Sequence, residues 1–104
     1  MPATFLTSDT HFGHAGVCRF MNPDDPDVKL RPWDDPDTMD EEMIRRWNDR
    51  VRPNDKVYHL GDVVINRKAL RTLHRLNGDK VLIRGNHDIF RDEEYRVYFR
   101  ELRA

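Results

Sequence analysis

Polar residues able to bind metal ions follow three short apolar segments of this 104-residue chain. Asp9 and His11 come directly after the first segment, and Asp62 comes after the second. The third segment is followed by Asn86, His87 and Asp88. This set offers carboxylate, imidazole and amide donors without a thiolate, which suits divalent ions such as Mn²⁺, Fe²⁺, Zn²⁺ or Ni²⁺. The sequence therefore points to a site with mixed oxygen and nitrogen ligands.

The spacing of these residues indicates how they converge. In extended backbone, residues two apart project to the same side, so we expect Asp9 and His11 to face one ion. Asp62 and Asn86 each follow closely on a glycine, which lets the backbone turn sharply after a strand. A carboxylate between two sites can bridge metal ions about 3.5–4 Å apart, and Asp62 is central in chain order. Each cluster alone is also ordinary turn chemistry, so the prediction depends on their joint occurrence.

The elements that must position these residues alternate along the chain. Apolar segments predict strands at residues 3–6, 57–60 and 81–83. Apolar residues at helical spacing predict helices at 38–51, 67–76 and 95–102. Thr38 and Glu41 form the pattern of a capping box at the start of the first helix. The proline- and aspartate-rich residues 20–37 predict a long irregular loop.

This alternation predicts an α/β fold, a three-stranded parallel β-α-β-α-β-α unit with right-handed crossovers. In such sheets, ligands bind outside the carboxyl ends of the strands. All three polar clusters fall at those ends. No repeat or composition shift divides the chain, so residues 1–104 are predicted to form a single domain.

Composition limits the partners of this domain. The net charge of −1 provides no broad basic field for nucleic acid or a membrane surface. The single cysteine, Cys18, excludes a disulfide framework and favours a reducing cytoplasm. Residues 1–10 do not have the pattern of a signal peptide, and no apolar run approaches the ~20 residues of a membrane span.

Three sequence phrases resemble the motifs of a known family. SDTHFGH, YHLGDV and LIRGNHD are similar to those of the calcineurin-like metallophosphoesterases, especially small bacterial and phage members. The resemblance runs over nearly the whole chain. It implies hydrolysis of phosphomonoesters or phosphodiesters by a hydroxide that two divalent ions activate. It also implies that the chain corresponds to the first half of an α/β/β/α sandwich.

The resemblance implies a role for each site residue. Asp62 would bridge the two metal ions, and Asn86 would also contact the phosphate. His87 would protonate the leaving oxygen or clamp the phosphate, and Asp88 would orient His87. Mn²⁺ is the expected ion, with Fe²⁺, Zn²⁺ and Ni²⁺ as alternatives. The metal ligands implied by the family are Asp9, His11, Asp62 and Asn86.

The chain departs from the family pattern after the third motif. The later half of the family supplies three more histidines, and none in this chain lies beyond His87. The second metal would keep only Asp62 and Asn86, and the domain is interpreted as a truncated, N-terminal half. Three hypotheses follow: a phosphoesterase, a binding or structural protein with one weak metal site, or a site completed by a second copy or another chain. Among partners, nucleic acid is expected only as a possible substrate.

Several other polar residues have two interpretations. His14 is expected near the site or on an exposed loop. His59 is expected in the core behind the ligands rather than among them, and His74 on the surface. The acidic residues Asp24, Asp25 and Asp27 favour a solvated loop over a calcium site, because they lack the EF-hand order.

Overall fold

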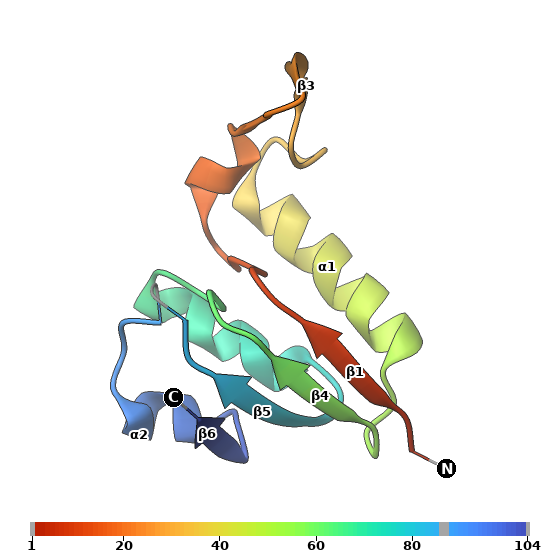
Figure 1. Ribbon diagram of the computed structural model, residues 1–104, viewed down its shortest axis with the longest axis vertical. Coiled ribbons are helices and arrows are strands. Elements are labelled where there is room, and N and C mark those ends of the chain that lie inside the picture. Colours follow the sequence, from red (N-terminus) through yellow and green to blue (C-terminus); the bar gives the residue numbers. More distant parts are fainter. Residues whose placement is uncertain (1, 86–87, 104) are drawn as a thin grey trace.

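A parallel four-stranded sheet is the centre of the molecule. The computed structural model describes residues 2–85 and 88–103 (Figure 1). The strands lie in the order β1-β4-β5-β6, and every neighbouring pair is parallel. Their bounds are β1 (Thr4–Thr7), β4 (Lys56–His59), β5 (Asp79–Ile83) and β6 (Glu101–Arg103). The three predicted strands and the α/β class are therefore confirmed.

The fourth strand replaces most of a predicted helix. The tail forms only a five-residue helix, α2 (Asp92–Arg96), before the chain turns into β6. Tyr95 and Phe99 are buried, as helical spacing predicted, but Leu102 pairs with Leu82 in the sheet. The prediction of a helix at residues 95–102 is wrong because an edge of β5 was available for backbone pairing. The Arg84 amide bonds the Arg103 carbonyl at 2.9 Å there.

The long helix α1 (Pro36–Arg50) begins two residues before Thr38, the expected cap. Asp35 is the N-cap, and its carboxylate accepts a hydrogen bond from the Thr38 amide at 2.8 Å. Pro36 occupies the first turn, where its missing amide hydrogen costs nothing. The predicted Thr38–Glu41 capping box is therefore wrong, and Glu41 instead pairs with Arg75.

The helix predicted at residues 67–76 forms in place as a 3₁₀ helix, η2 (Arg67–Arg75). Asn66 caps it by accepting a hydrogen bond from the Ala69 amide at 2.9 Å. A 3₁₀ helix has three residues per turn, so side chains at i and i+3 lie in one row. Leu70, Leu73 and Leu76 have this spacing, and all three are buried.

The segment predicted as an irregular loop contains some regular structure. After a 3₁₀ turn, η1 (Ala15–Cys18), which precedes this segment, the chain forms a small antiparallel pair within it, β2 (Met21–Asn22) and β3 (Asp25–Lys29). This hairpin projects from the end of the molecule beyond α1 (Figure 1). Its carboxylates are exposed, and Asp25 accepts a bond from the Asp27 amide at 3.1 Å. The acidic residues are thus exposed to solvent, as predicted, but Asp25 and Asp27 lie in the strand β3 rather than in a loop.

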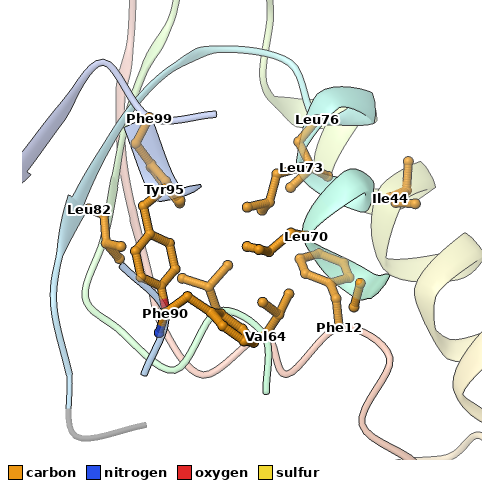
Figure 2. Close-up of a cluster of buried hydrophobic side chains, with 12 residues drawn as sticks. Phe12, Ile44, Val64, Leu70, Leu73, Leu76, Leu82, Phe90, Tyr95 and Phe99 are labelled. Carbon is orange, nitrogen blue, oxygen red and sulfur yellow. The ribbon is translucent and has the colours of Figure 1, made fainter. Parts of the chain in front are cut away.

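One apolar cluster joins the sheet to the helices (Figure 2). Leu82 of β5 points into it together with the η2 leucines and Tyr95. Successive strand residues alternate faces, so Val81 lies on the opposite face, in one row with Leu6 and Tyr58. On that face Leu6 is 71% exposed. No helix among the described residues is long and apolar enough to cross a membrane.

Truncating Leu73 should therefore destabilise the domain strongly. Leu73→Ala removes a side chain that is 1% exposed, and we expect the free energy of unfolding to fall by about 2–5 kcal/mol. Leu6→Ala is the matched control and should change it by less than about 0.5 kcal/mol. Urea denaturation measures both. Equal losses in the two variants would show that the core does not lie on the helix side of the sheet.

Candidate metal centre

The segments that follow β1 and β4 run side by side beyond the strands. The Asp9 amide donates to the Gly61 carbonyl at 2.9 Å, and the His11 amide donates to the Asp62 carbonyl at 3.1 Å. The Phe12 amide continues this pairing to Val63 at 3.0 Å. Backbone hydrogen bonds therefore bring residues some fifty positions apart in the sequence to one place.

Three predicted ligands converge there. One donor atom from each of Asp9, His11 and Asp62 lies within 4.8 Å of the others. His11 Nε2 is 3.8 Å from Asp9 Oδ1 and 3.9 Å from Asp62 Oδ2. These distances are too long for hydrogen bonds, and they suit donors that share an ion at about 2.0–2.2 Å from each. The side chains of His11 and Asp62 are 15% and 20% exposed, so the group is partly shielded.

The backbone at these three residues is unusual. Asp9, His11 and Asp62 have φ of 54°, 51° and 55°, and they are the non-glycine residues with positive φ in the described part of the chain. A left-handed conformation costs on the order of 1–3 kcal/mol at a non-glycine residue and tends to mark functional sites. The prediction that extended backbone aligns Asp9 with His11 is wrong: two left-handed turns direct these side chains.

Two glycines make the close approach of the loops possible. A Cβ on Gly61, which has φ of 113°, would lie 2.8 Å from the Gly85 Cα. A Cβ on Gly85 would lie 3.1 Å from Asp62 Oδ1. Gly61 therefore needs a residue without a side chain, and a larger residue at Gly85 would press on a candidate ligand.

Behind the ligands lies a buried chain of polar groups. His59 is 1% exposed, and its Nδ1 accepts a hydrogen bond from the Gly61 amide at 3.1 Å. Its Nε2 therefore carries the proton and donates to Thr10 Oγ1 at 2.9 Å, and Thr10 donates to the Val63 carbonyl at 3.0 Å. Burial lowers the pKa of His59 to about 4, so the ring is neutral at physiological pH. The predicted place of His59 behind the ligands is confirmed.

Asp88 ties the third loop to the second. Its carboxylate accepts hydrogen bonds from the amides of Gly85 at 2.6 Å, Asp62 at 2.9 Å and Val63 at 3.1 Å. The residue is 3% exposed. Asp88 therefore fixes the backbone on both sides of a candidate ligand.

Asn86 and His87 lie outside the described residues. The predicted role of Asn86 as a ligand and that of His87 as a general acid stay predictions. The predicted contact between Asp88 and His87 also involves a residue outside the described part of the chain, so it too stays a prediction.

Arg31 is a site residue that the sequence analysis missed. Its guanidinium donates to the carbonyl of Asp9 at 2.5 Å and to that of Thr10 at 2.8 Å. It lies against the sulfur of Met39 at 3.4 Å, and burial lowers its pKa. Arg31 follows the hairpin, 21 and 22 residues from the two carbonyls that it bonds, and no local pattern marks it. Only the folded chain shows that it holds the first ligand loop.

Arg84 holds the third loop in a similar way. Its guanidinium donates to the carbonyls of Asp88 and Phe90, the latter at 2.9 Å, and pairs with Asp92. It also lies over the ring of Tyr95, 5.2 Å from the centroid. Its position directly before Gly85 was the available signal in the sequence, because the motif LIRGNHD contains it.

His14 lies beside the candidate ligands, which confirms the prediction of proximity. Its Nδ1 is 3.1 Å from the Nδ1 of His11, and the ring centroids are 5.2 Å apart. His74 is exposed on η2 with its ring against Tyr98, which confirms its surface position. Cys18 is 1% exposed beside Met39 and belongs to the interior.

The family model for calcineurin-like phosphoesterases matches residues 4–103. The chain belongs to this family. Membership supports a metal-dependent phosphoesterase in general terms, and the family implies divalent metal ions. The donor chemistry of Asp9, His11 and Asp62 fits such ions, because carboxylates and imidazole are ligands of Mn²⁺, Fe²⁺ and Zn²⁺.

Two proteins are similar to this chain along nearly all of its length. The chain is 41% identical over 101 residues to an uncharacterized protein of Methanocaldococcus jannaschii, covering 93% of this chain and 52% of that protein. It also resembles the crystal structure of a protein of unknown function from Aquifex aeolicus. That likeness has a TM-score of 0.72 at 28% identity and covers 100% of this chain and 52% of the other. The chain thus spans about half the length of both relatives.

Removing one acceptor from Asp88 should loosen the site. In Asp88→Asn, an NH₂ group replaces an oxygen that accepts backbone amides, and we expect the free energy of unfolding to fall by about 1.5–3 kcal/mol. The exposed Asp27→Asn, in the hairpin, is the matched control and should be neutral. Urea denaturation measures both variants, and a neutral Asp88→Asn would contradict the assigned role.

Proposed function

We propose that the chain is a metal-dependent phosphoesterase acting on phosphomonoesters or phosphodiesters, with Mn²⁺ as the preferred ion. The observation that carries this proposal is the group formed by Asp9, His11 and Asp62 at the carboxyl ends of two parallel strands. Ligands of parallel α/β sheets bind at that edge. The family match supports the same chemistry in general terms.

Each residue has a proposed task. Asp9 and His11 would hold one metal ion, and Asp62 would contribute to both. When bound, divalent ions polarise a phosphoryl oxygen and lower the pKa of a water molecule. Asn86 is proposed as a further ligand, and His87 as the group that gives a proton to the leaving oxygen.

The remaining proposals concern context. We propose that a nucleic acid would be a substrate of this protein rather than a stable binding partner. The net charge of −1 offers no broad basic surface for such binding. We also propose the cytoplasm as the compartment, because the single cysteine is buried and unpaired with another cysteine.

A second candidate is a metal-binding half-domain that needs another chain to complete the site. The sheet face opposite Leu82 favours this candidate, because Leu6 and Leu60 are 71% and 47% exposed near it. Parallel sheets are normally covered on both faces. A second copy or a complementing chain would cover this face and contribute additional ligands.

An assay with Mn²⁺ and an aryl phosphodiester tests the first candidate. We expect Mn²⁺-stimulated turnover, and Asp62→Ala should reduce it to the level of the metal-free protein because it removes the central ligand. Asp27→Ala, in the exposed hairpin, is the control and should keep the wild-type rate.

Metal content and mass measured on the same preparation separate the two candidates. Bound metal without turnover of any phosphate ester would contradict the first candidate and support the second. A light-scattering mass equal to one free chain, in an active preparation, would contradict the need for a second copy.

A further inference from the structure

The contact between His11 and His14 joins the same atom of two rings. The two Nδ1 atoms are 3.1 Å apart, and the ring planes differ by 29°. Two bare ring nitrogens would repel at this distance, and two N–H groups would clash. One Nδ1 therefore carries a hydrogen and donates, and the other accepts.

The other nitrogen of His11 decides which arrangement can bind metal. Nε2 of His11 faces the carboxylates of Asp9 and Asp62 at 3.8 and 3.9 Å. A metal ion needs the lone pair of a neutral imidazole, so this nitrogen must be without a hydrogen. The single hydrogen of the neutral His11 ring must then lie on Nδ1.

We propose that His14 is the positioning residue that makes His11 a metal ligand, by accepting the Nδ1 hydrogen of His11 at its own Nδ1. This acceptor fixes both the tautomer and the ring orientation of His11 and directs the Nε2 lone pair at the two carboxylates. Outer partners of ligating histidines commonly act in this way through a carboxylate or carbonyl oxygen. Here a second imidazole takes that place.

The surroundings hold His14 in the accepting position. A Cβ built on Gly16 would lie 2.8 Å from His14 Nε2, so the ring packs directly on the η1 backbone. The ring of Phe20 also meets the ring of His14 edge-on, with the two ring centroids 6.1 Å apart. The base of the hairpin therefore supports His14, and His14 supports a ligand.

The inference rests on the proposed metal site, but it is tested without turnover. Titration with Mn²⁺ by calorimetry compares three variants of the full chain. His14→Leu fills a similar volume without an acceptor, and we expect metal affinity to fall by about 10–100-fold. His14→Asn places an amide oxygen near the position of Nδ1, so its affinity should lie closer to the wild type. His74→Leu, on the exposed face of η2, is the matched control and should bind as the wild type does.

Ring ¹⁵N chemical shifts provide a direct test in the Zn²⁺-loaded protein, which is diamagnetic. At a pH about one unit above the ordinary histidine pKa of about 6.5, we expect a hydrogen on Nδ1 of His11 and none on Nδ1 of His14. The reverse pattern would overturn the proposal. Wild-type affinity in His14→Leu, or equal losses in His14→Leu and His14→Asn, would also overturn it.

These results are distinguishable from failure of the proposed function. A protein that binds metal in a His14-dependent way without hydrolysing phosphate esters would keep this inference and contradict the enzyme. A protein that hydrolyses phosphate esters and binds metal equally well in every variant would contradict this inference and keep the proposed enzyme. Absence of metal binding in the wild type would overturn both.

Discussion

The pairing of residues 9–12 with residues 61–63 is the interaction on which the site depends. It continues the β1–β4 ladder beyond the strands, although the backbone there is no longer extended. Three residues in this segment adopt left-handed conformations, each costing on the order of 1–3 kcal/mol. Hydrogen bonds between the two loops offset part of that cost. They also fix the directions of three side chains that would repel or drift apart in a relaxed turn.

Buried polar groups behind this pairing keep it from relaxing. The neutral His59 and the hydroxyl of Thr10 satisfy the amide of Gly61 and the carbonyl of Val63. The carboxylate of Asp88 satisfies the next amides along the same loop. Among the described residues, every buried side-chain nitrogen or oxygen has a partner. Since a buried group without a partner costs about 1–3 kcal/mol, a shift of either loop would be opposed at several points.

The sequence predicted the sheet well because buried parallel strands have strong local signals. The apolar run at Val81 and the glycines before the polar clusters are short-range features, and each lies where it was expected. The wrong predictions fall where contacts between distant parts of the chain, or a competing cap, outweighed the local pattern. Residues 101 and 102, predicted as helix, pair with the edge of β5 as part of strand β6, and Asp35 takes the place of Thr38 as the cap. The candidate ligands were identified by type and order, but their left-handed backbone has no simple residue pattern.

Two arginines hold the loops of the site, and one of them, Arg31, lies outside the sequence motifs. Arg31 reaches the carbonyls of Asp9 and Thr10 from the segment after the hairpin, and Arg84 reaches those of Asp88 and Phe90. Each therefore gives a hydrogen-bond partner to backbone carbonyls of the loops that form the site. A planar guanidinium can bond two neighbouring carbonyls at once, whereas the ammonium of lysine is a single point. The ligand loops are thus held from behind by the buried polar groups and at their carbonyls by these two side chains. The long segment 20–37 supports the metal centre through Arg31 and through Phe20, whose ring meets that of His14, even though none of its carboxylates joins the ligand group of the described residues.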